Sequence, residues 1–303
     1  MNQIIFGTRG LPYRLQDKIS EGGFGDVFLA EQIGSGRTVA VKVLRDYRNA
    51  DALRHFRREV EVLHSLGING IIELLDYNLN VQPPFFIMPY MSGGTLSKWA
   101  GKLALPNFVS IARWLTNLVL QLHSKNQVHR DIKPDNILVD GAGELRIADF
   151  GLGNDPRFTM VFTGHGAGTR GYAAPEVAVY GQIPTRASDI YSLGATLFHL
   201  LTGIHPSKAA SFDLWNHSRA VPKELRDAVL EMLRPVPEQR PSAQQLLFRL
   251  AGLNLAEQAP SPPPPPPPRR QQSSDAGAWG AAAIGLLFLV GLGVAAGSGK
   301  RRR

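Results

Sequence analysis

The sequence predicts an α+β protein with a small β-rich lobe, a larger α-rich lobe and one apolar segment near its C-terminal end. Residues 15–44 have strand character, and the β-branched stretch 37–44 follows a Gly-Ser-Gly turn signal. After Gly93 and Gly94 the apolar residues recur mostly at helical spacing. Residues 276–298 carry no charge. Strands followed by helices indicate two unlike lobes, and the uncharged stretch indicates a membrane segment.

Composition excludes several classes of protein. The chain of 303 residues is long enough for two lobes, and 44% hydrophobic with 19% charged residues indicates a globular body. The absence of cysteine excludes disulfides, thiolate metal sites and cysteine nucleophiles, and it fits a reducing compartment. The net charge of +8 suggests nucleic-acid binding, but the tail from Pro260 onward carries +5 of it. We therefore expect no nucleic-acid partner.

The elements of the body follow from local patterns. The first ten residues have no long apolar run after their first basic residue, so we expect no secretory signal and place the start of the body near Pro12. Two further strands are expected at 71–77 and 85–90. Helical periodicity predicts helices at 51–66, 107–126, 186–202, 222–233 and 242–251.

The C-terminal part has a different composition, and the body is expected to end near Ala256. Seven consecutive prolines at 262–268 would span about 22 Å as polyproline II, which favours a stiff spacer over a docking ligand for another protein. Residues 279–296 would form a helix of about 27 Å, enough for a bilayer, with Trp279 at one interface. We expect a linker at 257–275, a single-pass membrane segment at 276–298 and a basic tail at 299–303.

Two early segments indicate phosphate chemistry. Residues 20–27 (SEGGFGDV) form a glycine-rich turn that lets backbone approach phosphates, although this signal alone is weak. In the strand that follows, alternation places Ala40 and Lys42 on one face, leaving space for a flat ring beside an ammonium group that needs an anion. Phosphate or a carboxylate would serve as that anion. Of the glutamates on the helix that follows, Glu59 is the better candidate for the carboxylate. Glu61 competes, but it points away from the apolar stripe of its helix.

A second group of polar residues follows in the helical half. Residues 129–136 read HRDIKPDN, and a predicted hairpin then runs to Asp149. Asn136 and Asp149 would lie at the same open end of that hairpin, where their oxygens suit Mg²⁺. Asp131 lies in the preceding loop and could receive a hydroxyl proton. One such aspartate could simply cap a loop, but three converging polar groups with Lys133 among them favour chemistry.

With these motifs in order, the chain resembles the eukaryotic-like serine/threonine protein kinases, a family also found in bacteria. The resemblance covers about residues 13–251 and includes the glycine-rich loop, VAVK, the helix glutamate, HRDIKPDN, DFG at 149–151 and APE at 174–176. It implies the bilobal protein-kinase fold, with a kinase domain at 13–256, an N-lobe at about 13–90 and a C-lobe at about 91–256.

The resemblance also implies roles for individual residues. Lys42 would hold ATP phosphates and pair with Glu59, and Asn136 and Asp149 would bind Mg²⁺ or Mn²⁺. Asp131 would accept the hydroxyl proton while Lys133 neutralises the transferred phosphoryl group. The nucleotide would contact Ile19, Ser20, Glu21, Gly22, Gly23, Phe24, Gly25, Val27, Ala40, Lys42, Met88, Met91 and Leu138. The chain departs from the family at Ser20, where the first loop glycine is usual, and at Pro89, where a hinge glutamate is common.

The same resemblance indicates the substrate. Lys133, and residues 168–172 before APE, are similar to the serine/threonine branch, so protein substrates with Ser or Thr are expected, with Thr169 approaching Asp131. Arg130 beside Asp131 suggests control by phosphorylation of Thr163 or Thr159, in trans between self-associated copies. Glu176 would pair with Arg240, and Asp189 would brace the HRD backbone.

The basic tail and the intact motifs bear on the location and the function of the protein. We expect a bacterial inner-membrane protein with its kinase domain in the cytoplasm, yet the four basic residues at 300–303 favour the cytoplasmic side for the tail as well. Attraction of that tail to anionic lipid is another interpretation. A pseudokinase scaffold and a small-molecule phosphotransferase are the competing functions. The intact Lys42, Asp131, Asn136 and Asp149 argue against the scaffold, and the APE segment argues against the phosphotransferase.

Overall fold

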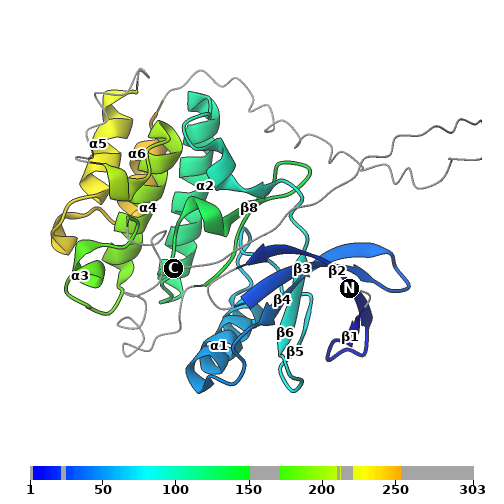
Figure 1. Cartoon of the computed structure of the whole chain (residues 1–303). Helices are drawn as coiled ribbons and strands as arrows, with labels where there is room; N and C mark the ends of the chain where they lie inside the picture. Colours follow the sequence, from blue (N-terminus) through cyan, green and yellow to red (C-terminus); the bar gives the residue numbers. More distant parts are fainter. Residues whose placement is uncertain (1–2, 22–24, 151–170, 210–211, 213–220, 254–303) are drawn as a thin grey trace, which may run out of the picture. The chain divides into compact units, whose positions relative to one another are not determined.

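The computed structural model describes residues 3–21, 25–150, 171–209, 212 and 221–253. The chain divides into two compact units, Met1–Pro266 and Pro267–Arg303, and the second lies wholly outside the described residues. Within the first unit a strand-rich part precedes a helical part, as the sequence predicts (Figure 1).

The strand-rich part is built on one antiparallel sheet with strand order β1-β2-β3-β4-β6-β5. One of its faces contributes Ala40, Phe86 and Met88 to the large apolar core, and the other contributes Val39, Val41 and Ile87 to a second, smaller core. The strands are β1 (Ile4–Phe6), β2 (Pro12–Glu21), β3 (Gly25–Gln32), β4 (Arg37–Leu44), β5 (Asp76–Asn78) and β6 (Phe85–Pro89).

Helix α1 (Ala50–Leu66) packs beside this sheet and confirms the predicted helix at 51–66. The Asn49 side chain caps its first turn by accepting from the backbone N–H groups of Asp51 and Ala52. Gly67, at φ 52°, ends it in the left-handed conformation that glycine adopts at little cost. The buried stripe Phe56, Val60, Leu63 and Leu66 faces the core. This packing fixes where Glu59, on the same helix, can reach.

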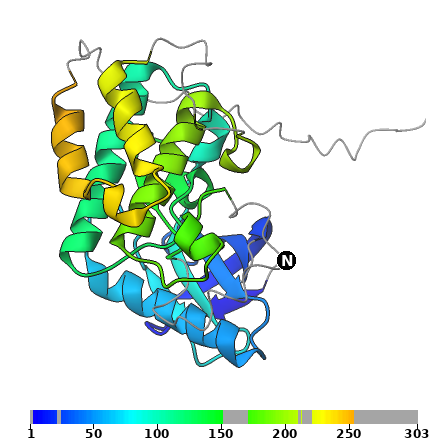
Figure 2. The ribbon, with the colours of Figure 1, turned by 90° about the vertical axis from the view of Figure 1, so that its left-hand side faces the viewer.

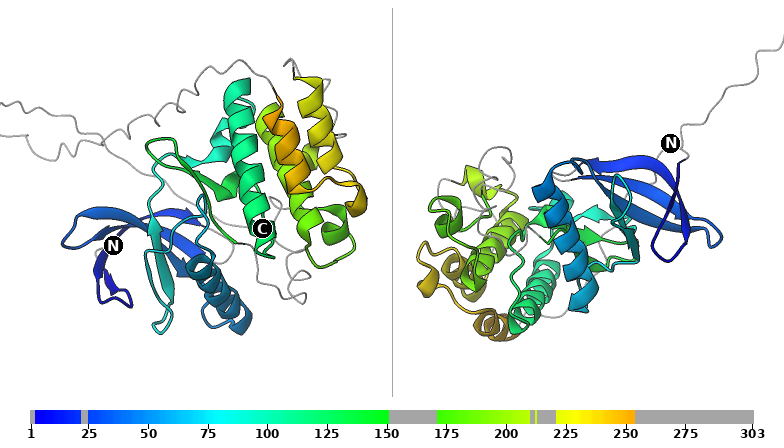
Figure 3. Two further views of the ribbon diagram at one scale, coloured as in Figure 1. Left: turned by 180° about the vertical axis from the view of Figure 1, so that it is seen from behind. Right: turned by 90° about the horizontal axis from the view of Figure 1, so that it is seen from below.

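Strand β1 is not predicted by the sequence pattern, which placed the start of the body near Pro12. It pairs with β2 and forms the edge of the sheet that lies away from α1 (Figure 3). The turn after it is fastened to β5, because Thr8 donates from both N and Oγ1 to the buried Asp76 carboxylate, at 3.1 and 3.0 Å. A Cβ on Gly7 would lie 2.0 Å from the same carboxylate, so only glycine fits. Because β1 has only three residues and is followed directly by a turn, it is too short to show the alternating pattern of a strand in the sequence.

The predicted strand at 71–77 is wrong for most of its length. Only Asp76–Asn78 forms a strand, β5. Ile71 instead makes isolated bridges to Asn69 and Ile147, and Ile72 N donates to Ile147 O at 2.9 Å. Ile71 and Ile72 are buried because they pass beside the strand at Leu145–Ile147, and Leu75 reaches the large sheet through its N–H, which donates to Ile87 O at 2.8 Å.

Four longer helices pack together in the second part of the unit (Figures 1 and 2). Helix α4 is buried along most of its length, which places Asp189 and Ser192 inside the core. A small sheet of order β7-β8-β9 lies before it in sequence. The helices are α2 (Leu105–Ser124), α3 (Pro175–Ala178), α4 (Arg186–Thr202), α5 (Lys223–Met232) and α6 (Ala243–Ala251), and the strands are β7 (Gly94–Thr95), β8 (Ile137–Val139) and β9 (Leu145–Ile147). Short 3₁₀ turns η1 (Leu96–Trp99), η2 (Pro134–Asn136), η5 (Pro206–Lys208) and η7 (Pro237–Gln239) connect them.

The fold class is thus confirmed for its two lobes. Within the described ranges, no helix combines the length and the apolar character that a membrane span requires. The expected membrane segment at 276–298 lies outside those ranges.

Candidate active site

Lys42 joins the two parts of the fold. It points from β4 toward Glu59 on α1, and its Nζ lies 2.9 and 3.0 Å from the two oxygens of that carboxylate. The same ammonium donates to Asp149 Oδ1, just beyond β9. The Phe86 ring centroid lies 5.6 Å from Nζ and adds a favourable contact for the cation. Glu61, the competing candidate, forms an ion pair with Arg58 on the helix surface instead.

This cluster holds two carboxylates against one ammonium. Burial alone would lower the pKa of Lys42, but Asp149 and Glu59 more than offset it and raise that pKa above its ordinary value. Burial raises the pKa of Glu59 to about 7, with the Asp149 charge adding to the rise and Lys42 opposing it. Burial also acts to raise the pKa of Asp149, but the charge and hydrogen bond of Lys42 lower it overall. When Glu59 is ionised, the cluster therefore has a surplus of negative charge that a bound cation would relieve.

Asp131 lies in the loop before β8 with its two oxygens in different surroundings. Its Oδ2 accepts from Lys133 Nζ at 2.7 Å and from Asn136 Nδ2 at 2.8 Å. Its Oδ1 is buried and has no hydrogen-bond partner within the described part of the chain. A buried carboxylate oxygen without a donor is costly unless a ligand supplies one. This oxygen is therefore placed to accept a proton from a bound hydroxyl group.

The backbone before Asp131 is held by a buried aspartate. Asp189, fully buried on α4, accepts from His129 N and Arg130 N, both at 2.8 Å, and its Oδ2 lies 3.1 Å from His123 Nε2. Arg130 adopts φ 74° and Asp149 adopts φ 56°, a region that residues other than glycine rarely occupy. Such strain is concentrated at functional sites, where the surrounding structure enforces it. Asp189 is thus a support for the loop, as the family resemblance implies.

Asn136 and Asp149 are the residues that could hold a metal ion. They flank the hairpin of β8 and β9, and Ala148 N donates to Asn136 O at 2.8 Å, which brings the two ends together. Asn136 Nδ2 donates to Asp131 O and Oδ2, so the side-chain carbonyl oxygen of Asn136 points away from these two acceptors. The Asp149 side chain is 51% exposed. One carboxylate and one amide oxygen fit Mg²⁺, which takes its other ligands from water and substrate phosphates. Within the described residues no group of three His, Cys, Asp or Glu side chains could form an all-protein metal cage.

The apolar residues expected around a nucleotide lie together. Ala40, Met88 and Met91 belong to one buried cluster, and three half-buried side chains pack against it: Ile19, Val27 and Leu138. Val27 and Lys42 are register partners on adjacent strands, so they share a face of the sheet. The ring of a nucleotide and its phosphates would thus meet apolar and cationic groups in the order that the sequence predicts.

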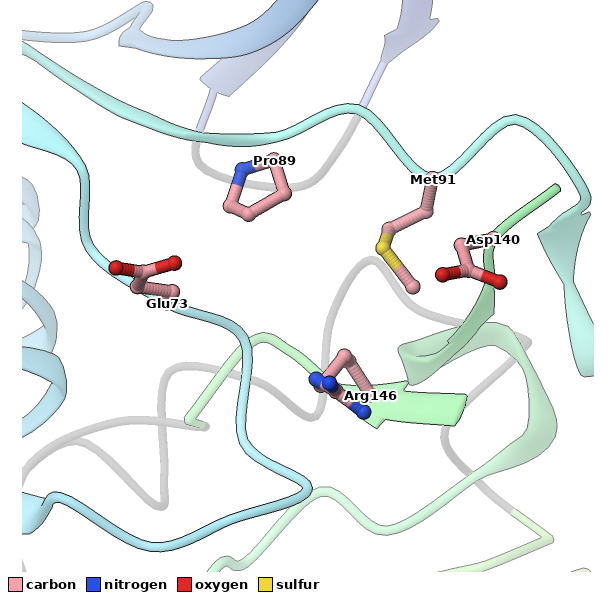
Figure 4. Close-up of a pocket in the computed structure, with 5 residues that line it drawn as sticks. All are labelled: Glu73, Pro89, Met91, Asp140 and Arg146. Atoms are coloured by element: carbon pink, nitrogen blue, oxygen red, sulfur yellow. The ribbon is translucent and has the colours of Figure 1, made fainter. Parts of the chain in front are cut away.

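A small hollow of about 120 Å³ lies beside the segment that joins the two parts (Figure 4). Glu73, Pro89, Met91, Asp140 and Arg146 line it, and the close-up shows Met91 on the joining segment and Arg146 on β9 at different sides of the hollow. Of the residues expected at the adenine edge, Pro89 and Met91 belong to this lining. Its size and charged lining separate it from the site around Lys42.

Several predicted site residues lie outside the described part of the chain. These are Gly22, Gly23 and Phe24 of the glycine-rich turn and Thr159, Thr163 and Thr169 before APE. Ser20 and Glu21, at the end of β2, and Gly25, at the start of β3, are in place on either side of the turn. A Cβ on Gly25 would come within 2.4 Å of Val43 O, so β4 requires this glycine independently of any ligand.

Sequence reasoning missed two contributions to the site. The Phe86 ring under Lys42 lies on the neighbouring strand β6, as the register partner of Lys42, and only the strand order reveals it. The His129 and Phe150 rings pack with centroids 4.6 Å apart, which connects the HRD loop to DFG. Burial lowers the pKa of His129, so its ring is neutral in this contact. Both residues of this second contact sit inside motifs, but nothing in the spacing predicts that they touch.

Comparison with known proteins agrees with this geometry. Residues 13–249 match the family described as "Protein kinase domain". The chain is 33% identical over 249 residues to the serine/threonine-protein kinase PrkC of Bacillus subtilis, covering 75% of this chain and 38% of PrkC. It is 33% identical over 263 residues to the DNA damage-responsive serine/threonine-protein kinase RqkA of Deinococcus radiodurans, covering 80% and 39%. It is 34% identical over 266 residues to the probable serine/threonine-protein kinase PkwA of Thermomonospora curvata, covering 83% and 35%.

The fold and the site have the two-lobed architecture of a protein kinase, and the chain belongs to the protein kinase family. It spans well under half the length of these relatives, between 35% and 39%.

Proposed function

We propose that the protein transfers the γ-phosphate of ATP to serine or threonine hydroxyls of protein substrates. The observation that carries the proposal is the asymmetry of Asp131, whose Oδ2 is held by Lys133 and Asn136 while Oδ1 has no donor among the described residues. Three named relatives are serine/threonine-protein kinases, and Lys133 stands at the position typical of that branch.

The residues act mainly by positioning and by charge. Mg²⁺ bound with ATP would neutralise phosphate charge, with Asn136 and Asp149 as its protein ligands. Lys42, fixed by Glu59, holds the phosphates in place. Asp131 Oδ1 orients the substrate hydroxyl and accepts its proton, while Lys133 offsets negative charge on the group in transfer.

The test is phosphate transfer by the full chain from labelled ATP with Mg²⁺ to a generic basic protein, followed by phosphoamino-acid analysis. We expect label on Ser and Thr, and an about hundredfold to ten-thousandfold loss in Asp131→Asn. Asp135→Asn is the matched control, because Asp135 is an exposed aspartate of the same loop. Equal transfer by Asp131→Asn and wild type would overturn the assignment of the proton acceptor. A wild type that binds ATP but transfers nothing would favour a scaffold that lacks catalysis.

We also propose that residues 276–298 anchor the chain in a membrane, with the kinase domain on the cytoplasmic side. The uncharged stretch and the edge tryptophan Trp279 support this. Membrane fractions from cells producing the full chain should retain it after a high-salt wash. The double substitution Leu286→Arg with Val290→Lys places two charges one helical turn apart within the apolar stretch, and it should release the chain. Retention of that variant in the washed membranes would contradict the anchor.

A further proposal concerns regulation in the activation segment. Arg130, beside the catalytic aspartate, supports phosphorylation of Thr163 or Thr159 by a second copy of the chain. Mixing active chain with the inactive Asp131→Asn chain should label the inactive partner at one of these threonines. Label confined to the active chain would contradict transfer between copies.

A further inference from the structure

Four charged residues on the strand-rich part form a closed network. Asp26 Oδ1 lies 2.9 Å from Lys18 Nζ and 2.5 Å from Arg45 Nη2. The same two cations also contact Glu21. Lys18 Nζ lies 3.1 Å from its carboxylate, and Arg45 Nη2 lies 2.9 Å from it. Each acid therefore touches both cations, and the charges balance.

The network joins three strands at the end of the sheet nearest the site. Lys18 and Glu21 come from β2, Asp26 from β3, and Arg45 directly follows β4. The pairing of β2 with β3 shifts register on both sides of Lys18. Such a local irregularity re-aims a side chain, here toward Asp26. The register partner of Asp26 is Val43, so the network lies on the face of the sheet opposite to Lys42.

The residues tied together flank the glycine-rich turn or follow the strand of Lys42. Glu21 ends β2 and Asp26 follows the first residue of β3, so the two acids stand at the two roots of the turn. Arg45 stands three residues after Lys42 along the chain. The network thus links the roots of the turn to the strand that carries the phosphate-binding lysine.

We propose that Asp26 is a positioning residue that holds the strand ends beside the glycine-rich turn, at Glu21 on β2 and Gly25 on β3, in register with Lys42 and so sets the affinity for ATP phosphates. The proposal rests on the proposed kinase function, since it assigns a role to the same site. Asp26 lies on the face of the sheet opposite to Lys42, and it acts through the backbone of β3 and through Arg45.

An ordinary surface ion pair contributes little, so the network needs features that separate it from one. Two cations from different strands share one oxygen of Asp26, and the Asp26 side chain is only 21% exposed. The hydrogen bond from Arg45, followed by that from Lys18, lowers the pKa of Asp26 against the opposing effect of burial. On the same hairpin the pair Arg14–Glu31 is single, longer at 3.6 Å and more exposed. It lies at the other end of the hairpin and serves as the matched control.

The experiment compares Asp26→Asn, Asp26→Glu and Glu31→Gln in the full chain by two readouts. The first is KM for ATP and kcat with a basic protein substrate, and the second is calorimetric titration with ATP and Mg²⁺. We expect Asp26→Asn to raise KM for ATP and to weaken ATP binding by about threefold to tenfold, with kcat changed by less than about twofold. Asp26→Glu should recover most of the affinity, and Glu31→Gln should match wild type.

The outcomes separate this inference from the proposed function. Asp26→Asn with the ATP affinity of Glu31→Gln overturns the inference, as does a variant in which kcat falls and KM does not move. If wild type transfers no phosphate, the proposed function fails, but the titration still decides whether Asp26 sets ATP affinity.

Discussion

Two ion clusters in this protein are built in opposite ways. In the helical part, Arg240 donates to both oxygens of Glu176 at 2.6 and 2.7 Å, and it also donates to the carbonyls of Ala187, Arg234 and Pro235. One cation meets one anion, and every guanidinium nitrogen has an acceptor. At the site, Lys42 meets both Glu59 and Asp149, and the nearby Asp131 leaves one oxygen without a donor among the described residues.

The difference shows which cluster serves structure and which serves chemistry. A balanced, fully hydrogen-bonded buried pair is self-sufficient, and removing one partner leaves an uncompensated charge. A cluster with surplus negative charge and an open acceptor has capacity left for a cation and a hydroxyl group. Burial raises the pKa of the Glu59 carboxyl in the second cluster, a shift of the kind that is concentrated at functional sites.

The largest expected effect comes from breaking the balanced pair. Arg240→Leu should reduce the free energy of unfolding by about 3–5 kcal/mol, because Glu176 then stays buried without its cation. Urea denaturation measures the loss. The double variant Arg240→Leu with Glu176→Leu should cost less than Arg240→Leu alone, and an equal or larger loss would contradict the paired account.

Breaking the unbalanced cluster should change activity and spare the fold. Lys42→Met should lower kcat/KM by about a hundredfold or more, because the phosphates lose their fixed cation. Its free energy of unfolding should fall less than that of Arg240→Leu, because Asp149 is 51% exposed and the raised pKa of Glu59 lets that carboxyl take up a proton. Lys223→Met, at a lysine with 73% side-chain exposure, is the control and should retain activity. A Lys42→Met chain that unfolds early would place the lysine with the structural pairs.

The smallest expected effect lies at the N-terminal fastening, far from both clusters. Thr8→Val removes the hydroxyl that donates to Asp76 and keeps the shape of the side chain. The free energy of unfolding should fall by about 0.5–1.5 kcal/mol, the net contribution of one hydrogen bond. Activity should not change. A loss of kcat in this variant would connect β1 to the site in a way that no described contact suggests.

The sequence predicted most of the site because its motifs are local. Residues 129–136 lie in one loop, and the β8–β9 hairpin brings Asn136 near Asp149 by short-range pairing. Spacing along one helix separated Glu59 from Glu61, since only Glu59 lies near the apolar stripe. Helix boundaries were also close, because caps such as Asn49 and Ser242 stand at the helix ends.

Features that depend on long-range contacts escaped the sequence. Strand β1 is short and owes its place to Asp76, 68 residues away from Thr8. Ile71 and Ile72 are buried beside β9, and this burial imitates the signal of a strand. The Asp26 network needs the register of three strands, and a charged residue beside a glycine-rich turn carries no such information by itself. Periodicity reports burial, whereas these features depend on which element causes it.

The most direct test of the account measures the free energy of unfolding of Glu59→Gln and wild type across pH. The folded pKa of Glu59, about 7, exceeds its ordinary value of 4.5, so the protonated form stabilises the fold below 4.5 and that stabilisation is lost as pH rises through about 7. Glutamine keeps the neutral form at every pH. We predict that the stability of Glu59→Gln relative to wild type increases as pH rises from about 5 to about 8, because only wild type loses the protonated carboxyl over this range. A stability difference that stays constant across this range would show that the Lys42 cluster is an ordinary ion pair and would contradict the account.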